Sequence, residues 1–257
     1  MIKIGIDLGC SFHKIVLIEN NKLIDYRVIR AANFESIEKA YIEELFQRVL
    51  DKTCIIAVTG GNSKKINIDD TLNFKVIDEI KAIAFGGNYF YPFCRRMISV
   101  SIGTGTCIVL FDNKSYRHLG GSGIGGGTLS GLSSYLLKEG GSKALKILFD
   151  LAGKGNLKET DISVEDIIGS GIGIMPGNAA ASHLGRLDKE TSLESLALGV
   201  INLISTELAN LIVFCARAHH IDDILVMGYP VSFSLLTSIM GERFNMLSPK
   251  IKLMIPN

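Results

Sequence analysis

The residues with the clearest chemical meaning are glycines that gather in short segments. The 257-residue chain contains 27 glycines, and nine of them fall in residues 8–12 (Gly9 alone), 103–106 and 120–128, beside Ser, Thr or Cys. A glycine turn can present backbone N–H groups to an anion, because no Cβ keeps the anion away. One such turn alone is more often only a tight turn that needs a positive φ. The repetition of the pattern favours phosphate binding.

Charged residues flank the first glycine turn, and a helix follows the third. Asp7 could hold a phosphate-bound Mg²⁺ through water, and Lys14 could reach the phosphates. The alternatives are a turn-capping Asp and a solvated Lys. Residues 125–128 open a helix, whose N–H groups and dipole attract phosphate. The sequence has no Walker loop and no GxGxxG in a βαβ context.

The elements that must position these residues follow from the apolar pattern. Apolar residues spaced by four predict a helix over residues 36–50. A second helix begins at Asp78, whose carboxylate can cap it, and stops at Gly86 and Gly87. The strands predicted in the first half are residues 2–7, 13–19, 23–29, 54–58 and 74–77.

The same pattern restarts in the second half of the chain. Strands at 97–102 and 107–111, a turn at Asp112 and Asn113 and a third run repeat the first three strands. Later predicted elements are helices at 129–137, 191–219 (opened by capping-box spacing at Thr191 and Glu194) and 232–244, and strands at 224–227 and 251–255. Two βββ-α units predict an α/β protein with two lobes, residues 1–95 and 96–257, and a cleft between them.

Composition and charge exclude several classes of protein. The chain is 47% hydrophobic and 21% charged, which excludes disorder, and its net charge of +1 gives no basic field for nucleic acid or membrane. Five cysteines without a CxxC pair indicate reduced thiols of a cytoplasmic protein rather than a zinc site. No signal peptide is evident, and the most apolar run, residues 193–218, is interrupted by Asn202, Glu207 and Asn210.

Residues 4–11 (IGIDLGCS) and 101–106 (SIGTGT) resemble the phosphate motifs of the actin, sugar-kinase and heat-shock ATPase superfamily. More closely, the chain resembles the bacterial type II pantothenate kinases, through residues 59–62 (TGGN), 78–80 (DEI) and 117–128 (RHLGGSGIGGGT), and weakly through 176–185. This resemblance implies a two-lobed actin-like ATPase (ribonuclease H-like) fold with a βββ-α repeat in each lobe and a nucleotide cleft between the lobes.

The resemblance also implies a reaction and a set of site residues. The reaction is the ATP- and Mg²⁺-dependent phosphorylation of the primary hydroxyl of pantothenate, the first step to coenzyme A, by a homodimer. Glu79 matches the catalytic base, although a Glu in a first helical turn also suits the helix dipole. Asp7 matches the metal-binding residue. The matched ATP-binding residues are Asp7, Gly9, Cys10, Ser11, Lys14, Gly103, Thr104, Gly105, Thr106, Gly125, Gly126, Gly127 and Thr128, and the substrate-binding set is Thr104, Thr106, Arg117, His118 and Ala181.

The sequence departs from the family at three places. Cys10 stands where the family has Gly, and the chain stops near Met254, where the family continues into a closing helix. His118 stands at the substrate-binding Arg, with Arg117 one place earlier. Since adjacent strand residues face opposite sides, Arg117 does not simply replace it.

These departures leave two alternatives to a pantothenate kinase. One is a catalytically weak or inactive homologue that binds nucleotide or coenzyme A. The other is an N-acetylhexosamine or sugar kinase of the same fold, although the zinc-binding cysteine cluster that several of those enzymes carry is not evident.

Overall fold

The computed structural model describes residues 2–31, 54–63 and 74–256, in two compact units, Met1–Gly86 and Gly87–Asn257. The helix predicted at residues 36–50 lies outside the described residues. The expected boundary was between residues 95 and 96. The division falls earlier because the last turn of a helix packs with the second unit, where Gly87 lies against the side chain of Ser99.

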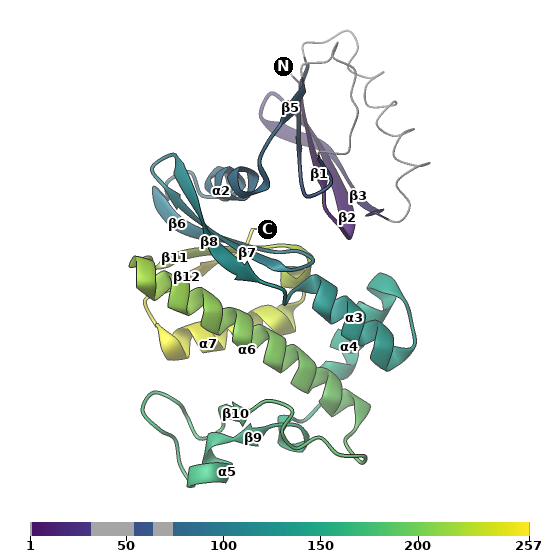
Figure 1. Cartoon of the computed structure of the whole chain (residues 1–257), viewed down its shortest axis with the longest axis vertical. Helices are drawn as coiled ribbons and strands as arrows, with labels where there is room; N and C mark the ends of the chain where they lie inside the picture. Colours follow the sequence, from purple (N-terminus) through teal and green to yellow (C-terminus); the bar gives the residue numbers. More distant parts are fainter. Residues whose placement is uncertain (1, 32–53, 64–73, 257) are drawn as a thin grey trace. The chain divides into compact units, whose positions relative to one another are not determined.

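The first unit is built on a five-stranded sheet (Figure 1). The order is β3-β2-β1-β4-β5, with β1 antiparallel to β2 and parallel to β4, which is parallel to β5. The strands are β1 (Ile2–Leu8), β2 (Phe12–Glu19), β3 (Lys22–Arg30), β4 (Cys54–Thr59) and β5 (Phe74–Val76), and α2 (Glu79–Phe90) follows.

Alternation along β1 fixes which side chains of this sheet are buried. Ile4, Ile6 and Leu8 point into a cluster with Ile56 and Val58 of β4, each no more than 4% exposed. Asp7 lies on the opposite face, because successive side chains of a strand alternate. The polar residues at the strand ends, Asp7 among them, therefore lie on the face opposite the core.

The second unit repeats this sheet. Its order is β12-β11-β6-β7-β8, so two antiparallel hairpins again lie beside two parallel strands. The strands are β6 (Arg96–Ile102), β7 (Thr106–Asp112), β8 (Ser115–Ser122), β11 (Asp223–Met227) and β12 (Lys252–Met254). The predicted internal repeat and α/β class are confirmed.

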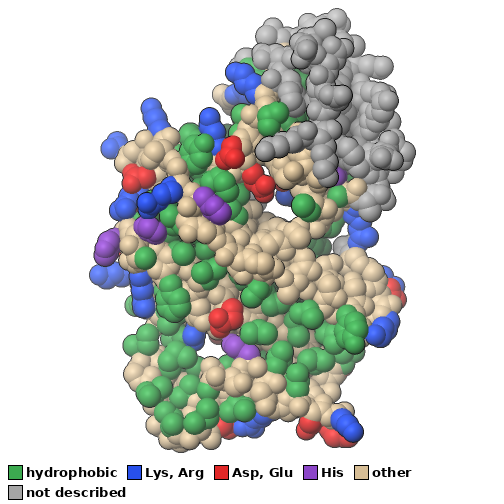
Figure 2. Space-filling model, viewed as in Figure 1, with side chains coloured by type: hydrophobic (Ala, Val, Ile, Leu, Met, Phe, Trp, Pro, Cys, Tyr) green, Lys and Arg blue, Asp and Glu red, His purple; other side chains and the backbone are tan. Residues whose placement is uncertain are grey.

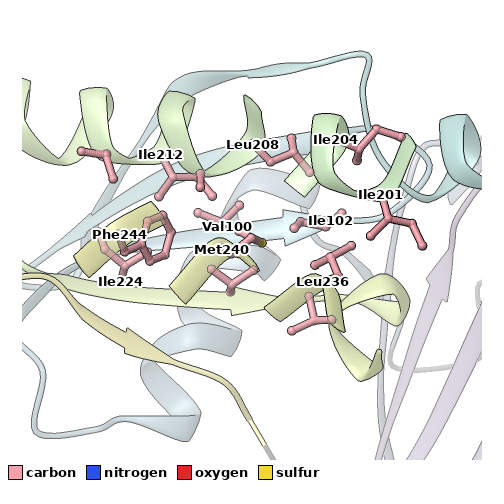
Figure 3. Close-up of a cluster of buried hydrophobic side chains, with 14 of the residues drawn as sticks. Val100, Ile102, Ile201, Ile204, Leu208, Ile212, Ile224, Leu236, Met240 and Phe244 are labelled. Atoms are coloured by element: carbon pink, nitrogen blue, oxygen red, sulfur yellow. The ribbon is translucent and has the colours of Figure 1, made fainter. Parts of the chain in front are cut away.

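Helices pack on the second sheet and bury the larger core (Figure 3). Ile204, Leu208 and Ile212 of α6 meet Val100 of β6 and Phe244 of α7, all at most 2% exposed. The helices around this core are α3 (Gly126–Leu137), α4 (Gly141–Ala152), α6 (Leu193–His219) and α7 (Ser234–Leu247).

Several elements were not predicted from the sequence. They are α4, α5 (Val164–Ile168), β9 (Ile162–Ser163), β10 (Ala180–Ser182) and the 3₁₀ turns η3 (Leu157–Glu159) and η4 (Tyr229–Ser232). In Figure 1, β9, β10 and α5 lie on the side of α6 away from the sheet. The short strands lack a long apolar run, and α5 begins at a capping box formed by Ser163 and Asp166.

Two details of the helices differ from the prediction. Helix α2 continues through Gly86 and Gly87 to Phe90, so these glycines do not stop it. Helix α6 is capped by Ser192, whose side chain accepts the N–H of Ser195, rather than by Thr191.

The long helix α6 is more apolar than its polar interruptions suggested. Within the described part of the chain, it is long and apolar enough by length and composition to cross a membrane, with 61% of its most apolar window buried. Its side chains form the core shown in Figure 3. The burial favours a core helix of a folded unit over a membrane span.

Candidate active site

In the first unit, polar side chains stand in a row across neighbouring strands. Asp7 near the end of β1 is paired with Lys14 of β2 on one side and with Thr59 of β4 on the other. Paired residues point to the same face, so the three side chains share the face opposite the core. Lys14 Nζ lies 2.8 Å from Asp7 Oδ2. Ligands of α/β sheets commonly bind outside the carboxyl ends of parallel strands, where Asp7 and Thr59 lie.

Gly60 brings the backbone after β4 close to Asp7. Its φ is +94°, and a Cβ there would lie 2.7 Å from Asp7 Oδ1. The next turn is tied to β1 by a hydrogen bond from the Asn62 N–H to the Leu8 carbonyl. This position therefore requires glycine, both for its φ and for the space beside the carboxylate.

Glu79 stands at the first position of α2, directly after β5. Asp78 accepts the N–H of Lys81 at 3.1 Å, which confirms the predicted cap. Partial burial and the negative charge of Asp7 raise the pKa of Glu79, an effect that Lys14 opposes. A carboxyl group with a raised pKa takes up a proton more readily, as a catalytic base requires. Asp7, Lys14 and Glu79 are thus electrostatically coupled.

The first glycine turn is open at its tip. Gly9 is half-buried, Cys10 and Ser11 are exposed, and a Cβ on Gly9 would lie 2.7 Å from the carbonyl oxygen of Phe12. Gly9 is therefore needed for the tight turn itself. The thiol of Cys10 is free and accessible.

Hydrogen bonds join the second glycine loop, residues 103–106, to the start of α3. Gly126 N–H donates to the carbonyl of Gly103 at 2.7 Å, and Gly127 N–H donates to that of Thr104 at 2.9 Å. Gly125 N–H donates to Thr128 Oγ1 at 3.2 Å. The N–H groups that were expected to attract phosphate are therefore already paired, those of Gly126 and Gly127 with the loop and that of Gly125 with Thr128.

Close packing explains why this entrance is rich in glycine. Cβ atoms on Gly125, Gly126 and Gly127 would each lie 2.8 Å from carbonyl oxygens of residues 103–105. Thr106 Oγ1 donates to the carbonyl of Ile124 at 2.8 Å and closes the same contact from β7. The cluster builds a rigid support for the loop at residues 103–106.

The remaining predicted substrate residues are spread over the second unit. Arg117 pairs with Leu110 on the α6 face, where its Nη2 lies 3.4 Å from His219 Nδ1. His118 pairs with Val109, which pairs with Ser99, on the face where α2 packs through Gly87. Ala181 is exposed in β10, which Figure 1 shows well apart from β8. The chain does not bring Ala181 beside His118.

Two features are not predicted from the sequence. Thr59 belongs to a motif, and its position before two glycines at a strand end is the available signal. A largely buried cluster also joins Asp161, His183 and Asn202, with His183 Nδ1 3.0 Å and Asn202 Nδ2 2.9 Å from Asp161 Oδ2. These residues are far apart in sequence, so no spacing indicated them.

The residues present fit a magnesium ion that is held by one carboxylate and otherwise by phosphate oxygens and water. Among the described residues, no three of His, Cys, Asp and Glu gather into a metal cluster. Mg²⁺ usually binds through one or two carboxylates, phosphate oxygens and water. Asp7 offers such a carboxylate on an accessible face.

Solved structures share the fold of this chain. A dehydratase component A of Acidaminococcus fermentans superposes with a TM-score of 0.68 at 14% identity, covering 99% of this chain and 91% of that one. A sucrose-bound ROK family protein of Streptococcus pneumoniae gives 0.60 at 12% identity, covering 100% and 93%. The chain therefore has the actin-like ATPase fold of the ROK proteins and sugar kinases, as expected.

Sequence comparisons give the family. The model of the Fumble family matches residues 88–240. Type II pantothenate kinase of Oceanobacillus iheyensis is 30% identical over 213 residues, covering 79% of this chain and 75% of the relative. That of Bacillus cereus is 29% identical over 239 residues, covering 88% and 82%. The chain belongs to the Fumble family and, within it, to the type II pantothenate kinases, which confirms the resemblance.

Proposed function

We propose that the protein is an ATP-dependent kinase that phosphorylates the primary hydroxyl of pantothenate. The observation that carries the proposal is the row of strand ends in a chain of this family, where Asp7 and Lys14 lie 2.8 Å apart and Glu79 opens the helix that follows β5. A base near a metal-binding carboxylate and a lysine is the combination that phosphoryl transfer to an alcohol requires. We expect a cytoplasmic homodimer that binds no nucleic acid or membrane.

Each site residue has a role in this proposal. Glu79 accepts the proton of the substrate hydroxyl. Asp7 binds the metal through water, and Lys14, which pairs with Asp7 in this structure, turns toward the phosphates. Mg²⁺ would offset the charge of the phosphate oxygens. The turn at residues 9–11 contributes backbone N–H groups.

The second unit supplies the other proposed contacts. The loop at residues 103–106 contacts phosphate and, through Thr104 and Thr106, the acceptor. Residues 125–128 support this loop and border the nucleotide, and His118 and Ala181 stay in the proposed substrate-binding set. The guanidinium of Arg117 points to α6 and is left out of it. The rigid packing of the entrance against the loop supports a preorganised phosphate contact.

The test is to incubate purified protein with Mg²⁺, ATP and pantothenate and to measure 4′-phosphopantothenate. Glu79→Gln should abolish turnover while nucleotide binding, followed by calorimetry, stays intact. Asp78→Asn is the matched control, because Asn retains the cap and removes a neighbouring charge. Nucleotide binding without turnover on pantothenate would favour the binding-protein alternative, and turnover only on hexosamines the sugar-kinase alternative.

A further inference from the structure

One buried hydroxyl in the row of strand ends has no hydrogen-bond partner. Thr59 Oγ1 is inaccessible to solvent and makes no hydrogen bond within the described part of the chain. A buried hydroxyl without a partner destabilises a protein, and nearly all buried polar atoms are paired. Thr59 is therefore either a defect of the fold or a group that obtains its partner from a ligand.

The position of Thr59 points to a ligand. It is the strand partner of Asp7, on the face that carries Lys14, and it ends β4 as Asp7 nearly ends β1. Gly60 then passes so close to Asp7 Oδ1 that a Cβ would not fit. The hydroxyl thus lies next to the carboxylate at which the proposed function places the metal.

The other side of Thr59 borders the start of α2. The N–H of Ile77 donates to the carbonyl of Val58 at 2.7 Å. This hydrogen bond holds the segment just before Asp78 and Glu79 beside the end of β4. The order across the strand ends is therefore Lys14, Asp7, Thr59 and then Glu79. Thr59 is the uncharged member of this row, between the metal-binding carboxylate and the base.

We infer that Thr59 is a positioning residue whose hydroxyl donates to an oxygen of the bound magnesium–nucleotide, beside Asp7. The inference rests on the proposed function. The oxygen belongs either to a phosphate or to a water on the metal, and both accept the same hydrogen bond. A Thr at this place adds a donor without adding charge, so Asp7 keeps its attraction for the cation and Glu79 gains no further positive neighbour.

The test uses Thr59→Val, which keeps the shape of the side chain and removes the hydroxyl. Binding of magnesium–ADP, measured by calorimetry, should weaken by about 10- to 100-fold, the range for a hydrogen bond to a charged group. The melting temperature of the ligand-free protein should stay the same or rise, because the variant removes an unpaired buried hydroxyl. Thr59→Ser should restore binding.

Two further measurements separate the outcomes. ADP binding in EDTA should be unchanged in Thr59→Val if the partner is a metal-bound water, and weakened if it is a phosphate oxygen. Ser205 in α6 is a second buried hydroxyl that has no partner among the residues that the structure describes, and Ser205→Ala should leave nucleotide binding unchanged.

A lower melting temperature with unchanged magnesium–ADP binding in Thr59→Val would overturn the inference and assign the residue a structural role. Unchanged binding and unchanged stability would overturn it as well. If the wild-type protein binds no magnesium nucleotide, the proposed function fails. If the wild type binds it and Thr59→Val binds it equally well, only the role of Thr59 fails.

Discussion

Arg117 and His118 are consecutive in β8, and their side chains leave the sheet on opposite faces. Arg117 shares a face with Leu110 and reaches His219 of α6, whereas His118 shares a face with Val109 and Ser99. We propose that His118 stands at the position of the family's substrate-binding Arg. Arg117 offers no guanidinium on the face of His118.

The first prediction concerns the acceptor. His118→Arg should raise kcat/KM for pantothenate by about 10-fold, because a guanidinium binds a carboxylate through two charge-assisted hydrogen bonds. Arg117→Ala is the control, and it should change kcat/KM little, because its guanidinium points to α6. Steady-state kinetics with varied pantothenate measures both. Equal effects of the two substitutions would contradict the face assignment.

The second prediction concerns the pH dependence of turnover. Burial and the charge of Asp7 raise the pKa of Glu79, and a base must be deprotonated to act. Activity should therefore be full at high pH and fall, as the pH decreases, at a higher pH than for an ordinary Glu. Asp78→Asn removes a charge that also raises this pKa, so the acidic limb of log(kcat/KM) should move to lower pH. If the acidic limb lay at the same pH in Asp78→Asn, the limb would not report the ionisation of Glu79.

The fold was largely predictable because its signals are local. The strands β1, β2, β6 and β7, their hairpins and α6 follow from apolar runs and turn residues, and the repeat follows from comparing the two halves. The roles of glycines were harder to predict. Gly86 and Gly87 are typical of a helix end, yet α2 passes through them, because Gly87 is required by contact with a distant strand.

The site was predictable only where sequence neighbours carry it. Asp7 and the cap at Asp78 follow from strand and helix ends. The N–H groups of Gly126 and Gly127 donate to the carbonyls of Gly103 and Thr104, a pairing that local sequence does not encode. The place of Thr59 in the candidate site follows only from its strand pairing with Asp7. The hydrogen bonds of Asp161 are made by residues 22 and 41 positions away in the sequence.

The third prediction uses the glycine pair in α2. A Cβ on Gly86 meets nothing within 4 Å, so Gly86→Ala should stabilise the protein by about 0.5–1 kcal/mol. A Cβ on Gly87 would overlap Ser99 Oγ, so Gly87→Ala should destabilise it by about 1–3 kcal/mol.

Chemical denaturation of the single variants and of the double variant Gly87→Ala with Ser99→Ala measures how far the loss of stability depends on Ser99. Ser99 Oγ is buried without a partner in the described residues, so removing it should cost little and recover most of the loss. Additive effects would show that Ser99 is not the obstacle.

The fourth prediction concerns the largely buried Asp161 cluster. Burial by itself disfavours the ionised form, but hydrogen bonds from His183, the Leu184 N–H and Asn202 hold the pKa of Asp161 below its usual value. Asp161→Ala should lower the free energy of unfolding by about 2–4 kcal/mol, because these donors lose their acceptor. Asp161→Asn should lose less.

The pH dependence of stability gives an independent check on Asp161. A depressed pKa contributes stability that is present above the unfolded-state pKa and is lost as the pH falls through the folded-state pKa. The free energies of unfolding of the wild type and of Asp161→Asn should therefore converge as the pH is lowered from 7. A constant difference between them down to the acid limit would show that ionisation of Asp161 is not the cause.

The last prediction tests whether the glycines at the start of α3 support the loop at residues 103–106. A Cβ on Gly127 would lie 2.8 Å from the carbonyl oxygen of Thr104, which is backbone and cannot move aside cheaply. Gly127→Ala should therefore weaken ATP binding by about 10-fold or more, by displacing a preorganised loop, and should also destabilise the protein.

Gly131 is the matched control in the same helix, because a Cβ there meets nothing within 4 Å. Gly131→Ala should stabilise the protein by about 0.5–1 kcal/mol and leave ATP binding unchanged. Calorimetry and thermal unfolding of the two variants compare the same chemical change at two places in α3. If Gly127→Ala bound ATP as tightly as Gly131→Ala, the loop would not depend on the helix entrance, and residues 125–127 would serve only the packing of the fold.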